Sequence, residues 1–160
     1  MYISTVVSAQ TTLFVCFRYS SIAPFALPHQ TMCDTEIDGH AIPRDTMVWT
    51  NLWALHHDED VWGDPFEFRP ERYLDDEGCV VAADHPARKH TLAFGAGPRV
   101  CAGEVFALTR LFLMLATLMK HFEILPATTI AEQPSCDCRD MVFGMLLYPP
   151  EFQVRFQDRQ

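Results

Sequence analysis

The sequence is short of basic residues and of long apolar runs, and each shortage excludes a class of protein. It holds 12 lysines and arginines against 21 aspartates and glutamates, for a formal net charge of −9. A chain with this charge offers no positive surface to a phosphate backbone, so we do not expect it to bind nucleic acid. No apolar run reaches the roughly 18 residues that a membrane-spanning helix needs. The sequence therefore predicts no such helix.

The amino-terminal stretch also lacks the signs of a secretory signal. Residues 1–17 are moderately apolar, but they carry no basic segment and no convincing cleavage site. They show no clear periodicity and differ in character from the sequence that follows. With 160 residues, of which 49% are hydrophobic, the chain is long enough to bury one core.

The cysteines leave two interpretations open. Their even number is compatible with a secreted, disulfide-linked domain, whereas their irregular spacing favours reduced intracellular thiols. Cys136 and Cys138 could chelate a soft metal, but two ligands do not complete a site. His56-His57-Asp58 resembles a metal cluster only superficially, because adjacent histidines point apart and usually face solvent. The six cysteines are Cys16, Cys33, Cys79, Cys101, Cys136 and Cys138.

Short strands and turns are expected in the first half of the chain. Thr35–Ile37 and His40–Ile42 read as a hairpin, with Asp38-Gly39 as its tight turn. Thr46–Trp49 is rich in strand-forming residues, and Asn51–His56 reads as a short helical turn. Two prolines favour an extended segment over residues 24–29, and residues 58–76 read as a meandering loop.

The second half is dominated by one apolar helix. Residues 104–121 are interrupted only by Arg110 and Lys120, which predicts a helix buried on most of its surface. Residues 141–147 and 152–156 read as a terminal β-hairpin. The expected fold class is therefore mainly α with small β-sheets (α+β).

The most informative segment lies just before this helix, at residues 94–103. Phe94, Gly95, Gly97, Arg99, Cys101 and Gly103 fill the pattern F-G-x-G-x-R-x-C-x-G. Glycines allow backbone N–H groups to approach a sulfur atom, and the positive end of the helix stabilises negative charge there. Arginine is suited to pair with an anionic group of a bound ligand.

This segment resembles the haem-binding loop of the cytochrome P450 monooxygenases. The resemblance implies that Cys101 is the thiolate ligand of haem iron and that Arg99 and His29 contact the haem propionates. It implies that Phe94 packs beside the sulfur. Electrons would come from NADPH through a flavoprotein reductase, with cytochrome b5 as a possible further partner. Arg88 and Lys89 would belong to the basic face that meets the reductase, or would be an ordinary solvated charge pair.

Two further arginines match the family's structural motifs. Arg72, within Pro70-Glu71-Arg72-Tyr73, resembles the arginine of the family's P-E-R-F segment, and Arg18 resembles the arginine of its E-x-x-R motif. The glutamate of that motif is replaced by Val15, so Arg18 and Arg72 are expected to face each other without an anion between them. We therefore expect residues 1–17 to be non-native to the family, through truncation, splicing or a faulty gene model, and residues 18–160 to be the carboxyl-terminal haem-binding part.

The resemblance also suggests a substrate and a location. The segment Asn51-Leu52-Trp53-Ala54-Leu55-His56-His57 looks most like the steroid 17α-hydroxylase/17,20-lyase branch of the family. This likeness implies an apolar, steroid-like substrate and a location at the endoplasmic reticulum membrane. An anchor and a proton-delivering central helix are missing from the 160 residues, so an inactive fragment or haem-binding remnant is an alternative to an active monooxygenase. The residues expected to line the substrate cavity, or to be plain core, are Ile22, Ala23, Phe25, Leu27, Met141 and Val142.

Overall fold

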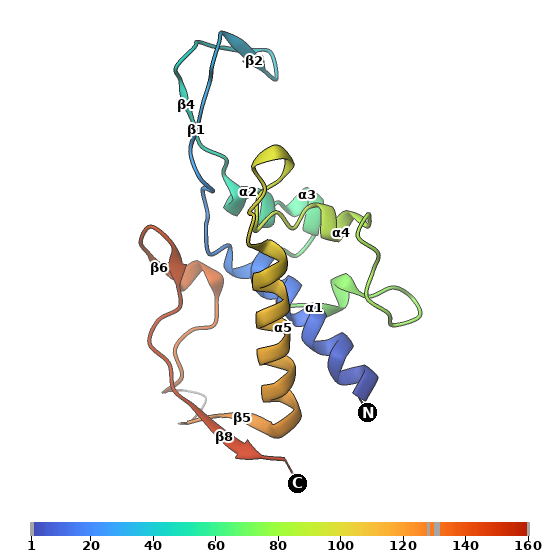
Figure 1. The fold of residues 1–160 in the computed structure, drawn as a ribbon. Coiled ribbons are helices and arrows are strands. Elements are labelled where there is room, and N and C mark those ends of the chain that lie inside the picture. The colour runs from blue at the N-terminus through green and yellow to red at the C-terminus, as the bar shows by residue number, and fades with distance from the viewer. Residues whose placement is uncertain (1, 128, 130–131, 160) are drawn as a thin grey trace.

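Two long helices form the body of the protein. The computed structural model describes residues 2–127, 129 and 132–159. Helix α1 spans Tyr2–Ser20 and helix α5 spans Glu104–His121; they pack against each other and cross at an angle (Figure 1). Shorter elements surround this pair, and the described sheets each have two strands. The expected class, mainly α with small sheets, is confirmed.

Helix α1 gives regular structure to the first part of the chain, where the sequence showed no clear periodicity. It continues to Ser20 because residues spaced three and four apart along it meet the same neighbours. Phe14 packs its ring on that of Tyr73 at 5.3 Å, and Val15 is fully buried. Arg18, one turn further along, is also fully buried.

The buried core is small and lies where α1 meets the segment that precedes the loop of residues 94–103. Val15, Tyr73 and Val81 form its centre, and Phe14, Tyr19 and Ala87 are the partly buried hydrophobic residues packed against it. Tyr73 keeps its hydroxyl satisfied within this core by a 2.6 Å hydrogen bond with Thr91 Oγ1.

Short helices occupy the segment between α1 and α5. Helix α2, Leu52–His56, confirms the expected helical turn, and Asn51 caps it by accepting a hydrogen bond from the Ala54 N–H at 3.0 Å. The expected loop over residues 58–76 contains two helical pieces. Further helical elements in this segment are α3 Glu59–Trp62, η1 Pro70–Tyr73, α4 Pro86–Lys89 and η2 Gly97–Arg99. Another, η4 Cys138–Asp140, lies after α5.

A two-part arm extends from the body (Figure 1). Strand β1 (His29–Gln30) pairs with β4 (Met47–Val48), and beyond them β2 (Thr35–Ile37) pairs with β3 (His40–Ile42). The predicted hairpin is confirmed, with Asp38 and Gly39 at φ +50° and +78° as a tight turn of this kind requires.

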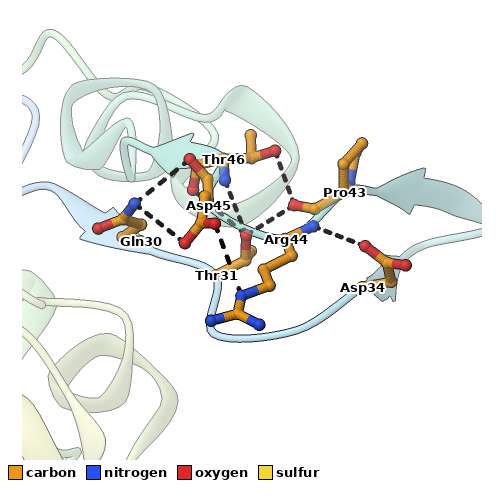
Figure 2. A network of polar contacts seen from close by, with 7 residues as sticks. All are labelled: Gln30, Thr31, Asp34, Pro43, Arg44, Asp45 and Thr46. Atoms are coloured by element: carbon orange, nitrogen blue, oxygen red, sulfur yellow. Dashed lines mark hydrogen bonds and ion pairs between the residues drawn. The ribbon is translucent and has the colours of Figure 1, made fainter.

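Polar contacts hold the two parts of the arm together, as Figure 2 shows. Thr31 Oγ1 donates to the Pro43 carbonyl at 2.7 Å and accepts from the Thr46 N–H at 2.9 Å. The Arg44 N–H donates to the Asp34 carboxylate at 2.8 Å. The arm is thus fixed by local hydrogen bonds, since its strands bury no hydrophobic side chain.

Helix α5 has the predicted bounds but not the predicted burial. None of its residues is fully buried, and Val105 and Phe106 are 77% and 65% exposed. The reason is that α1 crosses only one side of it, so most of its apolar surface has no cover among the described residues. No helix in the described part of the chain combines the length and the apolarity needed to cross a membrane.

The predicted terminal hairpin is wrong in its pairing. Strand β6 (Val142–Phe143) pairs with β7 (Leu147–Tyr148) around Gly144. The last strand, β8 (Val154–Asp158), instead pairs antiparallel with β5 (Phe122–Pro126), directly after α5. Phe156 packs edge-on against Phe122 at 5.7 Å, a long-range contact that the local pattern does not reveal. The turn-rich segment at residues 24–29 is likewise not extended throughout, because Ala26 has φ +50°.

Candidate functional site

The loop of residues 94–103 closes on itself immediately before α5. The Cys101 N–H donates to the Phe94 carbonyl at 2.9 Å, and the Gly95 N–H donates to the Leu92 carbonyl at 2.9 Å. Gly95 and Gly97 have φ +78° and +69°, a conformation that side-chain-bearing residues adopt only at a cost. These two glycines therefore set the path of the loop around Cys101.

Cys101 lies at the start of α5 with its side chain exposed. The Glu104 N–H donates to the Cys101 carbonyl at 3.2 Å, so the first turn of the helix begins directly beside the cysteine. A Cβ on Gly103 would lie 3.8 Å from Cys101 Sγ, which is ordinary van der Waals contact. Gly103 is thus less constrained than Gly95 and Gly97.

This donor set fits a haem iron held through sulfur. Cys101 has an exposed thiol at the amino end of the 18-residue helix α5, and the glycine-containing loop lies on one side of it. The helix dipole stabilises an anionic sulfur at this position. The described residues contain no group of three or more His, Cys, Asp or Glu that could hold a bare metal ion. The two clusters noted in the sequence therefore form no such group. A macrocycle that brings its own four nitrogen ligands needs only the single sulfur.

Phe94 is half-buried and contacts α1. Its ring meets that of Phe17 edge-on at 5.0 Å. Together with the bond from the Cys101 N–H to the Phe94 carbonyl, this contact links helix α1 to the cysteine loop.

The two residues expected to contact propionates are both exposed. Arg99 ends the short helix η2 within the loop, and His29 begins strand β1 at the base of the arm. No hydrogen bond or ion pair joins these two side chains to each other in the part of the chain that the structure describes. Their role depends on a ligand between them and stays a prediction.

Arg18 is fully buried and is held by backbone carbonyls. Its Nη1 donates to the carbonyls of His56 and Pro65, both at 2.8 Å, and its Nη2 donates to that of Glu67 at 3.4 Å. Burial lowers the pKa of the Arg18 guanidinium. Arg18 thus fastens α1 to α2 and to the segment before η1.

Arg72 is also a structural residue and not a solvated loop charge. Its Nη1 donates to the Trp62 carbonyl at 2.7 Å, and its Nη2 forms an ion pair with the Asp64 carboxylate. Hydrogen bonding to Arg72 lowers the pKa of Asp64. The expectation of two arginines with no nearby anion is therefore corrected, since Asp64 supplies one to Arg72.

The lack of a glutamate at position 15 nevertheless accompanies two buried donor atoms without a partner. Val15 is fully buried at the motif position, and the Nε atoms of Arg18 and Arg72 are both buried without a hydrogen-bond partner. Each unpaired buried donor destabilises the fold. A carboxylate acceptor supplied close to these atoms would satisfy them.

The expectation that His56 and His57 face solvent is wrong. Both are buried, at 1% and 8% exposure, and neither faces solvent. His57 stacks on Trp53 and lies 3.4 Å from the thiol of Cys138, the one buried cysteine among six that are all free. The only signal for this burial was the apolar surroundings of the pair in the sequence.

A small cavity lies between α1 and the segment that precedes the loop. Its volume is about 160 Å³. Of the residues expected to contact substrate, Ile22 and Ala23 line this small cavity, whereas Phe25 and Leu27 are 41% and 80% exposed and lie outside it. The cavity is lined by Phe17, Ser21, Ile22, Ala23, His56, Ala93 and Phe94.

The last expected lining residues come near this cavity through the backbone. The Leu147 N–H donates to the Ile22 carbonyl at 2.8 Å, which places the β6–β7 hairpin beside the end of α1. Met141 and Val142 lie at the start of that hairpin, half-buried and exposed respectively. The hairpin is thus positioned next to the cavity but does not line it.

Comparison with known proteins agrees with the geometry of the loop. A family model described as Cytochrome P450 matches residues 16–156. Cytochrome P450 1A2 of Macaca fuscata fuscata is 45% identical over 107 residues, 67% of this chain and 20% of that protein. Cytochrome P450 1A2 of Felis catus is 43% identical over 114 residues, 71% of this chain and 22% of that protein.

A third relative matches a longer segment. Cytochrome P450 1A1 of Oryctolagus cuniculus is 39% identical over 127 residues, 78% of this chain and 24% of that protein. The chain therefore spans about a fifth to a quarter of the length of the curated relatives it matches. With the loop geometry, the buried arginines and a family match over most of its length, the chain belongs to the cytochrome P450 family.

Proposed function

We propose that this chain provides the thiolate side of a haem-thiolate monooxygenase site. Proteins of this family hold haem iron through a cysteine thiolate. When bound, haem supplies the activation of O2 and the insertion of one oxygen atom into an apolar substrate, the other oxygen leaving as water. The observation that carries the proposal is the closed glycine loop that presents Cys101 at the start of α5.

Residues of the chain would each contribute a separate part of the binding. Cys101 would ligate the iron, with the amino end of α5 stabilising its negative charge. Arg99 and His29, both exposed, would pair with the two propionates. Phe94, fixed against Phe17, would cover the sulfur on the protein side and limit the access of water.

The finer expectations have unequal support. A steroid-like substrate gains no support from the relatives reported above, which are P450 1A1 and 1A2 proteins. From the resemblance to the family we also propose electron supply from NADPH through a flavoprotein reductase, with cytochrome b5 as a further partner, and a location at the cytosolic face of the endoplasmic reticulum. The assignment of residues 18–160 as the family's haem-binding part remains part of this proposal.

A second candidate function is a haem-binding remnant without catalysis. The exposure of Val105, Phe106 and Cys101 favours it, because the described residues cover only one side of the loop and of α5. Such a chain would bind haem through the same sulfur but would not enclose a substrate above it.

The proposal is tested by adding haem to the purified chain, reducing it and exposing it to carbon monoxide. We expect the red-shifted Soret band typical of thiolate ligation. Cys101→Ala should remove this band, whereas Cys79→Ala, which alters another exposed cysteine, should keep it. A chain that takes up no haem, or that binds it equally well without Cys101, would overturn the proposal. A normal band without product formation in the presence of reductase and NADPH would favour the remnant.

A further inference from the structure

A buried chain of hydrogen bonds runs from the end of α1 to the start of the cysteine loop. The Leu92 N–H donates to His56 Nε2 at 3.0 Å, and His56 Nδ1 lies 2.7 Å from Ser21 Oγ. Ser21 Oγ in turn donates to the Arg18 carbonyl at 2.9 Å. His56 and Ser21 are only 1% and 2% exposed. The family motifs named above do not account for this series of hydrogen bonds.

The donors and acceptors of this chain leave His56 a single protonation state. Ser21 has one hydroxyl proton, and that proton is used on the Arg18 carbonyl, so Ser21 Oγ accepts from His56. His56 Nδ1 must therefore carry a proton. Because the Leu92 N–H points at Nε2, that nitrogen must present its lone pair. The structure fixes the neutral Nδ1–H tautomer.

The charged groups around His56 favour the same state. Burial, together with the smaller effects of the nearby His57 and Arg18, lowers the pKa of His56 to about 4. Arg18 also donates to the His56 carbonyl at 2.8 Å, so its positive charge faces this residue from α1. A second proton would abolish the bond from the Leu92 N–H.

We infer that His56 is a positioning residue that sets the start of the cysteine loop through its bond with the Leu92 N–H. The Leu92 carbonyl accepts from the Gly95 N–H, and the Phe94 carbonyl accepts from the Cys101 N–H. The imidazole thereby holds, through two short steps of backbone, the peptide that orients Cys101. Its effect on haem rests on the function proposed above, whereas its effect on the loop does not.

Two variants separate this role from mere filling of space. In His56→Gln the side-chain oxygen can reach the place of Nε2 and accept from Leu92, whereas in His56→Asn the shorter amide reaches only the place of Nδ1 and serves Ser21. Hydrogen exchange at the Leu92 N–H should be unchanged within about threefold in His56→Gln and about tenfold faster in His56→Asn. Ser21→Ala is the control for the other end and should leave Leu92 protected.

The same variants are then titrated with haem. His56→Gln should keep the Soret band of the reduced carbon monoxide complex. His56→Asn should bind haem with about tenfold lower affinity. Nitrogen-15 spectra of the unaltered chain should show a protonated Nδ1 and an unprotonated Nε2 for His56. Equal exchange at Leu92 in both variants, or the opposite tautomer, would overturn the inference. If no variant binds haem but the exchange results hold, the proposed function fails and the positioning role stands.

Discussion

At the scale of single residues, the protein depends on a few buried polar side chains that tie α1 to the rest of the chain. Arg18 donates to three backbone carbonyls, and His56 joins the end of α1 to Leu92. Such groups are tolerated in the interior only when they are paired. Their protonation and pairing therefore control stability.

Stability should fall as the pH drops toward the folded-state pKa of His56. Its pKa is about 4 in the folded chain, against an ordinary value of 6.5. Between these values the unfolded chain binds more protons, so the stabilisation is complete above pH 6.5, is lost as the pH falls to 4 and changes no further below. The loss should be about 3 kcal/mol. Urea unfolding of the chain and of His56→Gln between pH 7 and pH 4 checks it, because the variant should lack this part of the slope.

A carboxylate at position 15 should pair with the unsatisfied arginine atoms. We expect Val15→Glu to be more stable at neutral pH than Val15→Gln by about 1–3 kcal/mol, because a charged acceptor offered to the buried Nε atoms of Arg18 and Arg72 forms a stronger hydrogen bond. Denaturant unfolding of both variants measures the difference. The two variants share size and shape, so equal stability would show that position 15 does not reach these donors.

At the scale of elements, local patterns predicted what local physics determines. The bounds of α5 and the β2–β3 hairpin followed from an apolar run and an Asp-Gly turn. The pairing of β8 with β5 did not, because the two strands lie far apart in sequence and each buries little. The burial of α5 was also predicted wrongly, because an apolar sequence favours burial but does not show whether other residues cover the helix.

The glycines of the cysteine loop should differ in their tolerance of alanine. Gly95→Ala and Gly97→Ala place a side chain at positive φ and should each destabilise the loop by about 1 kcal/mol or more. Gly103 has negative φ and open contact distance, so Gly103→Ala should be milder. Haem retention and thermal unfolding of the three variants measure this order. A more damaging Gly103→Ala would mean that the close approach at the sulfur dominates over backbone conformation.

At the scale of the whole molecule, a large apolar surface is left uncovered. Along α5, Val105, Phe106, Leu113 and Met114 are between 55% and 77% exposed. Surfaces of this kind drive association in water.

Replacing exposed apolar residues of α5 should lower self-association without loss of fold. In sedimentation experiments we expect the chain to associate, and the double variant Val105→Lys, Met114→Lys to associate markedly less. Circular dichroism should be unchanged, because both side chains are more than half exposed. A monomeric unaltered chain would show that this face does not drive association.

The sequence by itself determined the family, the cysteine loop and the position of the helix that follows it, because a ligand, its glycines and a helix start are adjacent in the chain. It also identified both arginines and the absence of the glutamate at Val15. Only the tertiary structure decided how those arginines are paired, that His56 is buried and connected to Leu92, and that β8 lies beside β5. These features depend on contacts between residues far apart in sequence, and no local pattern contains them.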